Sequence, residues 1–223
     1  MSRRIVALHG FLGQGSDWAA VRAATPREWD WICPNLFAPG QEDWRGKLPE
    51  EGKSWLVGYS FGGRLALRLL EEDQQRWHGA LLLSVNPGNF QSEDERRSRR
   101  LSDAAWAAAF REDPWEDVVK QWNRQGVFSG GCAPTRAESS FDRGKLACAL
   151  EDYSVASQFA DTARLGGAFV WVAGGEDKKF CTLLHAMRQA GFPGTFFALP
   201  GAGHRLLQHA PAEVAAALDR LAG

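Results

Sequence analysis

The sequence has little that points to a redox, metal or membrane protein. Its 223 residues contain four cysteines, and no pair has the spacing of a CxxC motif or a zinc site. We therefore expect reduced thiols, a cytoplasmic location, and no metal ion or other cofactor. The apolar run before His9 is too short for a signal peptide, and no stretch approaches the 18 apolar residues of a membrane-spanning helix. The cysteines are Cys33, Cys132, Cys148 and Cys181.

Surplus charge is absent too, and lysine is scarce. The 26 basic and 27 acidic residues give a formal net charge of −1, so we expect no nucleic-acid partner. Only six of the basic residues are lysine, and the other 20 are arginine. The planar guanidinium of arginine pairs bidentately with carboxylates. The positions of the arginines therefore bear on the kind of small molecule that the protein binds.

Short apolar runs alternate with helical patterns through most of the chain, which predicts an α/β fold with a mostly parallel sheet flanked by helices. The length fits one domain. We expect strands at Arg4–Leu8, Trp31–Pro34, Ser54–Gly58, Ala80–Val85, Ala168–Ala173 and Thr195–Leu199, and helices at Asp17–Ala24, Phe61–Glu72, Cys181–Ala190 and Ala212–Leu221.

The alternation stops between Gln91 and Ala160, where no convincing strand occurs. Helical periodicity continues there at 94–110, 114–123 and 137–150. This stretch follows the fourth expected strand and precedes the fifth. We therefore predict a core formed by residues 1–90 and 161–223, with residues 91–160 inserted as a helical cap over the carboxyl edge of the sheet.

A nucleophile elbow is the strongest local motif. The apolar strand that ends at Val57 runs into Gly58–Gly62 (GYSFG), and a helical pattern follows at once. A G-x-S-x-G motif between a strand and a helix presents the serine hydroxyl above the sheet. Small glycine neighbours let the strand and the helix approach each other at this strained turn. The motif predicts a reactive Ser60.

A serine needs a histidine and a carboxylate to become reactive, and in this fold the acid precedes the histidine in the chain. Asp177 follows the fifth expected strand and His204 follows the sixth. We expect Asp177 to orient His204, which would exchange a proton with Ser60. Glu176 is the competing acid. The other histidines after Ser60, at 78, 185 and 209, fall on expected helices or helix ends, and we expect them on the surface or in packing contacts.

A third motif, His9–Gly13 (HGFLG), follows the first expected strand directly. A loop of this type supplies a backbone N–H that faces the nucleophile elbow. We expect the N–H groups of Phe11 and Phe61 to form an oxyanion hole. His9 is expected to stabilise the loop and to take no part in the reaction.

Together these motifs predict an α/β-hydrolase fold, and their details resemble one of its families. The chain is similar to 2-succinyl-6-hydroxy-2,4-cyclohexadiene-1-carboxylate synthases of menaquinone and phylloquinone biosynthesis. The similarity spans nearly the whole chain. It includes Arg64 after the elbow, the Pro-Gly pair of Asn86–Gly88 with the arginine-rich segment that follows, and the cap residues Trp122 and Phe128.

The resemblance implies a lyase that removes a proton from a cyclohexene carboxylate and eliminates pyruvate. Ser60, activated by His204 and Asp177, would then act as a general base. The substrate carries several carboxylates, which implies several arginines in the pocket. The carboxylate-binding residues implied by matching position are Arg64, Arg99 and Arg143, with Arg96 as the alternative to Arg99, and Tyr59 and Trp122 are implied to line the pocket.

Two other functions remain open at this point. A carboxylesterase, thioesterase or C–C bond hydrolase would use the same residues with Ser60 as a nucleophile, but it would have little use for three pocket arginines. A non-catalytic binding protein of the same fold would not need Ser60, Asp177 and His204 together. The arginines between 96 and 100 are also typical of a solvated helix face, which is their default reading.

Overall fold

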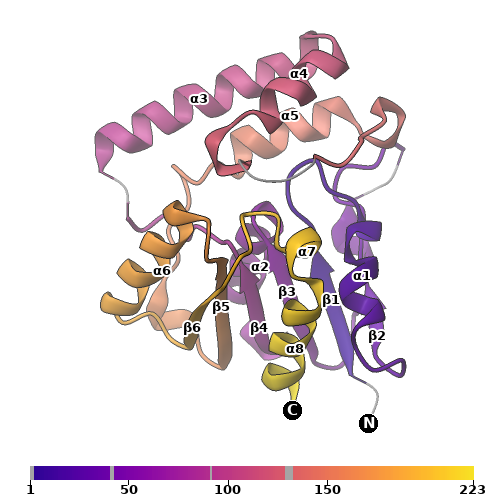
Figure 1. Cartoon of the computed structure of the whole chain (residues 1–223), viewed down its shortest axis with the longest axis vertical. Coiled ribbons are helices and arrows are strands. Elements are labelled where there is room, and N and C mark those ends of the chain that lie inside the picture. Colours follow the sequence, from indigo (N-terminus) through magenta and orange to yellow (C-terminus); the bar gives the residue numbers. More distant parts are fainter. Residues whose placement is uncertain (1–2, 41–42, 91, 129–132) are drawn as a thin grey trace.

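The fold comes from a computed structural model, which describes residues 3–40, 43–90, 92–128 and 133–223. Cys132 lies outside this part of the chain, and so does Gln91, the residue at which the cap is expected to begin. Within the described part, the core is a single sheet covered by helices on both faces (Figure 1).

The sheet has six parallel strands in the order β2-β1-β3-β4-β5-β6. This confirms the α/β-hydrolase prediction of a mostly parallel sheet flanked by helices. Three strands are longer than expected: β3 continues to Tyr59, β5 continues to Gly174, and β4 begins at Trp77, whose side chain is buried. The strands are β1 (Arg4–Leu8), β2 (Asp30–Ile32), β3 (Ser54–Tyr59), β4 (Trp77–Leu83), β5 (Ala168–Gly174) and β6 (Thr195–Leu199).

Both faces of the sheet are buried because successive strand side chains point to opposite sides. In β1, Ile5 packs in the cluster that includes Val214 of α8, whereas Val6 packs in the cluster that includes Leu65 of α2. Helices α1 (Ala19–Ala23) and α8 (Pro211–Ala222) contact each other across one face, and α2 (Phe61–Glu72) and α6 (Lys178–Gln189) cover the other. A short helix, α7 (Leu206–His209), precedes α8.

Three helices between β4 and β5 lie together above the carboxyl edge of the sheet (Figure 1). We call these helices and the segments that join them the cap. They are α3 (Glu93–Glu112), α4 (Trp115–Asn123) and α5 (Arg143–Asp152). Helix α5 begins six residues later than the expected start at Ala137, because the Asp142 carboxylate accepts a hydrogen bond from the Lys145 N–H (3.0 Å) and caps the helix there.

Aromatic side chains join the cap to the core. The ring of Phe11, in the loop after β1, lies 5.2 Å from the ring of Phe110 in α3 and 4.5 Å from that of Trp122 in α4. Phe110 is fully buried. Cap and sheet therefore share one hydrophobic core, and Trp122 belongs to the contact between them.

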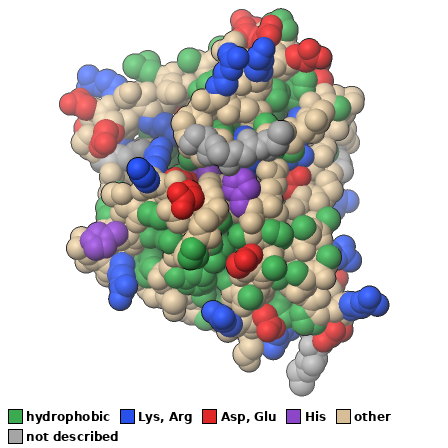
Figure 2. All heavy atoms as spheres, viewed as in Figure 1, with side chains coloured by type: hydrophobic (Ala, Val, Ile, Leu, Met, Phe, Trp, Pro, Cys, Tyr) green, Lys and Arg blue, Asp and Glu red, His purple; other side chains and the backbone are tan. Residues whose placement is uncertain are grey.

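The surface mixes both signs of charge. Figure 2 shows basic and acidic side chains interspersed over one face of the molecule. This pattern agrees with the formal net charge of −1. None of the helices in the described ranges is long and apolar enough to cross a membrane.

Candidate active site

Ser60 occupies a strained turn between β3 and α2. Its backbone has φ 52° and ψ −109°, a conformation that non-glycine residues rarely adopt. The Ser60 N–H donates to the Leu83 carbonyl of β4 (2.8 Å), which holds the turn against the sheet. A Cβ at Gly62 would lie 2.1 Å from the Leu8 carbonyl oxygen, so only glycine lets α2 approach β1 this closely. The local sequence thus determines the position of the half-buried serine at the turn.

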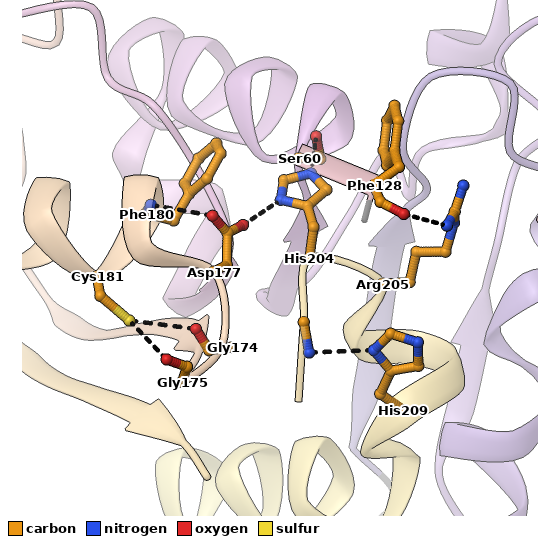
Figure 3. A network of polar contacts seen from close by, with 11 residues as sticks. Ser60, Phe128, Gly174, Gly175, Asp177, Phe180, Cys181, His204, Arg205 and His209 are labelled. Carbon is orange, nitrogen blue, oxygen red and sulfur yellow. Dashed lines mark hydrogen bonds and ion pairs between the residues drawn. The ribbon is translucent and has the colours of Figure 1, made fainter. Parts of the chain in front are cut away.

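A chain of two hydrogen bonds links Ser60 to a buried carboxylate (Figure 3). The Ser60 hydroxyl lies 3.2 Å from His204 Nε2, and His204 Nδ1 lies 2.7 Å from Asp177 Oδ2. With the proton on Nδ1, the imidazole donates to Asp177 and accepts from Ser60. His204 and Asp177 are both buried. The structure therefore brings the three residues together in the order that proton transfer from the serine requires.

Asp177 is fixed by a second contact. Its Oδ1 atom accepts from the Phe180 N–H (3.2 Å), so the same carboxylate caps α6 and binds His204. Glu176, the competing acid, is exposed to solvent. The N-cap hydrogen bond of Asp177 explains why α6 begins at Lys178, three residues before the expected start.

Three aromatic rings surround His204. The ring centroids of Phe180, Phe128 and Tyr59 lie 4.8, 5.6 and 5.7 Å from that of the imidazole. Figure 3 shows Phe180 and Phe128 on either side of His204. Burial raises the pKa of the Tyr59 phenol, which stays protonated at neutral pH. The rings limit access of water to the imidazole and strengthen its polar contacts.

The two expected oxyanion-hole residues lie at the same cavity as Ser60. Phe61 is the first residue of α2, where backbone N–H groups have no acceptor within the helix. Phe11 lies in the loop after β1 and lines the cavity with Phe61. Both N–H groups therefore belong to segments that border the cavity at the serine.

His9 holds the loop that carries Phe11. Its Nε2 accepts from the Leu36 N–H (3.0 Å), and its Nδ1 is 2.8 Å from the Gly10 carbonyl oxygen, to which it donates. Burial lowers the pKa of His9 to about 4. The imidazole is therefore neutral at physiological pH and has both nitrogens engaged in structural contacts.

The cavity at Ser60 is lined by Tyr59 and Trp122 and also carries three basic side chains, from Arg64, Arg99 and Lys179. Among the described residues that line it, none is acidic. Elsewhere in the described part of the chain, no group of three or more His, Cys, Asp or Glu is placed to hold a metal ion. The arrangement suits a small molecule with several negative charges.

Arg64 lies beneath this cavity on the first turn of α2. It is buried, donates to the Tyr153 carbonyl and places its guanidinium 4.9 Å from the centre of the Phe61 ring. Burial, and next the positive charge of Arg99, lower the pKa of Arg64 to about 9. The side chain therefore remains charged at neutral pH while its charge is poorly solvated. A negatively charged ligand would relieve that cost.

Arg99 and Arg96 have different partners although both project from α3. Arg99 Nε donates to Asp103 (2.8 Å), and Arg99 lines the cavity. Arg96 instead donates to the carbonyl oxygens of Ala156 (2.9 Å) and Gly88 (2.7 Å), where it joins the cap to the core. Of the two alternatives that the sequence left open, Arg99 is the one that lines the cavity at Ser60.

The position of Arg143 differs from the expectation that it binds a carboxylate in the pocket. This arginine is not among the residues that line either cavity near Ser60. Its guanidinium donates to the carbonyl oxygens of Phe110 (2.6 Å) and Asp113 and pairs with Glu138 (3.0 Å). These contacts satisfy carbonyl groups at the end of α3, which a helix leaves without partners. Arg143 therefore stabilises the cap.

Sequence reasoning missed two other arginines near the site. Arg205 follows His204, stacks on the Phe128 ring (4.8 Å), and donates to the Phe128 carbonyl (3.0 Å) and to Asn123 Oδ1 (2.8 Å). Arg136 forms a bidentate pair with Asp17 (3.0 and 2.7 Å). Both arginines line a second cavity that shares Phe11 and Trp122 with the first. The position of Arg205 beside His204 was the available signal. Nothing in the sequence pairs Arg136 with Asp17.

Comparisons with known proteins identify the family to which the chain belongs. Residues 5–217 match the family model described as "Alpha/beta hydrolase family". The 2-succinyl-6-hydroxy-2,4-cyclohexadiene-1-carboxylate synthase of Pectobacterium atrosepticum is 32% identical, over 95% of this chain and 90% of that protein. The synthase of the same name from Citrobacter koseri is 33% identical, over 84% and 85%. The structure of MenH from S. aureus superposes with a TM-score of 0.84 at 20% identity, over 98% of this chain and 92% of that one, which supports the fold.

Proposed function

This chain belongs to the alpha/beta hydrolase family and, within it, to the 2-succinyl-6-hydroxy-2,4-cyclohexadiene-1-carboxylate synthases, and we propose that it is a pyruvate-eliminating lyase. Its substrate is 2-succinyl-5-enolpyruvyl-6-hydroxy-3-cyclohexene-1-carboxylate, an intermediate of menaquinone or phylloquinone biosynthesis. The observation that carries the proposal is the contact of Ser60 with His204 in a cavity whose described charged lining residues are all basic.

The reaction follows from comparing substrate and product. The C2–H bond of the ring breaks, a C2=C3 double bond forms, and the C3=C4 double bond moves to C4=C5. The C5–O bond breaks as the C4=C5 bond forms, and the enolpyruvyl group leaves as enolpyruvate, which takes up a proton to become pyruvate. The step needs a base at C2 and an environment that stabilises negative charge on the succinyl carbonyl oxygen next to C2.

Ser60 is the base in this proposal. His204 Nε2 takes the hydroxyl proton of Ser60, and Ser60 Oγ removes the proton at C2. Asp177 keeps the Nδ1 proton of His204 in place and stabilises the imidazolium that forms. The aromatic rings around His204 reduce competition from water for the same proton.

The oxyanion hole and the basic side chains complete the site. The N–H groups of Phe11 and Phe61 face the developing enolate oxygen, and this is the interaction that grows in the transition state. Arg64 and Arg99 bind carboxylates of the substrate, and Tyr59 and Trp122 enclose the ring. The substrate has three carboxylates, one on the ring, one on the succinyl arm and one on the enolpyruvyl group.

The experiment that tests the function is a coupled assay for pyruvate. The purified protein is incubated with the substrate and, in parallel, with p-nitrophenyl acetate. The proposal predicts rapid release of pyruvate and slow cleavage of the ester. Rapid ester cleavage without pyruvate would establish the competing function, a serine esterase or thioesterase with Ser60 as its nucleophile.

A further inference from the structure

Lys179 is the third basic residue of the cavity, and neither the sequence motifs nor the proposed mechanism gives it a role. It comes from α6, whereas Arg64 comes from α2 and Arg99 from α3. The three cations therefore approach the cavity from three different helices. Lysine is scarce in this chain, with six residues against 20 arginines, so a lysine at this position stands out.

The three cations differ in what already engages them. Arg64 donates to the Tyr153 carbonyl, and Arg99 donates to the Asp103 carboxylate. The Lys179 ammonium makes no hydrogen bond or ion pair with any residue in the described ranges. Its side chain is exposed, so the ammonium is solvated at the mouth of the cavity. Its charge is thus available to a ligand without the loss of an existing partner.

Residues on either side of Lys179 contact the catalytic histidine or its carboxylate partner. Lys179 lies between Asp177, which caps α6 and binds His204, and Phe180, whose ring is 4.8 Å from the imidazole. These contacts fix the first turn of α6 relative to His204. The neighbouring Lys178 is also exposed, but it does not line the cavity. The two lysines therefore carry the same charge one residue apart, with only one of them at the site.

We propose that Lys179 binds one of the three carboxylates of the substrate and, with Arg64 and Arg99, provides one cation for each. The inference rests on the proposed function for the identity of the substrate. Because the ammonium is exposed, its attraction for a carboxylate is screened by salt more strongly than that of buried Arg64. Lys179 therefore contributes to capture of the substrate, and its contribution is similar in the ground state and in the transition state.

The test compares Lys179→Gln with Lys178→Gln, which removes the same charge outside the cavity. We expect Lys179→Gln to raise KM for pyruvate release about tenfold with kcat changed less than about twofold. Lys178→Gln should leave both constants unchanged. Lys179→Arg, which keeps the charge, should restore most of the KM. Added salt should raise KM less in Lys179→Gln than in the wild type, since the screened interaction has been removed.

A second measurement separates this inference from the proposed function. Citrate, a tricarboxylate, serves as the probe, and its binding is followed by tryptophan fluorescence. The proposed function fails and the lysine assignment stands if the wild type releases no pyruvate, while Lys179→Gln weakens citrate binding and Lys178→Gln does not. If pyruvate is released and the two variants have the same KM and the same citrate affinity, the function stands and the assignment is overturned. If no pyruvate is released and the two variants bind citrate equally, or neither binds it measurably, the assignment of Lys179 is overturned together with the proposed function.

Discussion

Arg99 donates a hydrogen bond from Nε to Oδ2 of Asp103, over 2.8 Å and one turn of α3. Asp103 is buried and also accepts from the Ser154 hydroxyl (2.6 Å), so its carboxylate cannot move freely. Arg99, in contrast, lines the cavity at Ser60. A fixed carboxylate thus orients the guanidinium of Arg99, and the terminal nitrogens of this group remain available for the substrate.

Asp103→Asn should therefore weaken substrate binding without touching the reacting groups. We expect KM for pyruvate release to rise about tenfold, because the neutral amide holds Arg99 less firmly, and kcat to change much less. Steady-state kinetics measures both constants. Glu93→Gln, which removes an exposed partner of Arg100 on the same helix, is the control. An equal effect of the two variants would show that Asp103 does not orient Arg99.

Asp177→Asn should lower kcat by about 10³-fold or more, since an amide does not stabilise the imidazolium and favours the wrong tautomer of His204. Asparagine is also a good N-cap, so α6 should keep its start. Circular dichroism checks the fold while the pyruvate assay checks the rate. The control is Glu176→Gln, which removes the exposed carboxylate next in sequence. If Asp177→Asn turned over normally, His204 would not depend on this carboxylate.

Arg205→Ala should loosen the contact between cap and core. The variant loses a stack on Phe128 and hydrogen bonds to the Phe128 carbonyl and to Asn123. We expect the free energy of unfolding to fall by about 2 kcal/mol, the range for a charge-assisted contact of this burial. Denaturant titration measures this quantity. Arg220→Ala, on the exposed side of α8, should leave it unchanged. Identical denaturant titration curves for the two variants would show that Arg205 does not stabilise the contact between cap and core.

His9 predicts a pH dependence of stability. Its pKa in the folded protein, about 4, lies below the ordinary value of 6.5, because burial disfavours the charged ring. The stability it contributes is thus fully present above pH 6.5 and is lost as the pH falls towards 4, since only the unfolded chain gains the proton. The loss between pH 7 and pH 5 is about 2 kcal/mol.

The measurement is the free energy of unfolding at pH 7 and pH 5 for the wild type and for His9→Gln. Glutamine can accept from the Leu36 N–H and does not titrate. We expect the wild type to lose about 2 kcal/mol more than the variant over this interval. An identical loss in both proteins would mean that His9 does not remain neutral in the folded state.

Much of the core could be predicted from the sequence because local patterns determine it. Continuous apolar runs determine where the strands lie. The glycines at the elbow permit the strained backbone conformation of Ser60 at the turn between β3 and α2. Asp177 and His204 follow β5 and β6, and the carboxyl ends of parallel strands meet at one edge of the sheet. Asp177 and His204 therefore lie near Ser60 because each of the three residues follows a parallel strand of the same sheet.

The cap was harder to predict because its helices contact one another through long side chains. The position of Arg143 in a helix does not reveal that the C-terminal end of α3 leaves carbonyl groups for it to bind. Likewise, the default surface reading of the arginine-rich segment holds for Arg100 but not for Arg99, and only the packing of α3 distinguishes them. Lys179 lies in the segment Gly175–Phe180, which shares in the family resemblance, but the resemblance assigns this lysine no role. Its significance comes from the direction in which α6 approaches the cavity.

The most direct test of the central claim follows pyruvate and the mass of the intact protein together during turnover of the cyclohexene substrate. If Ser60 is a base, one pyruvate forms for each substrate consumed, the protein mass stays unchanged throughout, and Ser60→Ala releases almost no pyruvate. A mass increase located at Ser60, or consumption of substrate without pyruvate, would contradict the account.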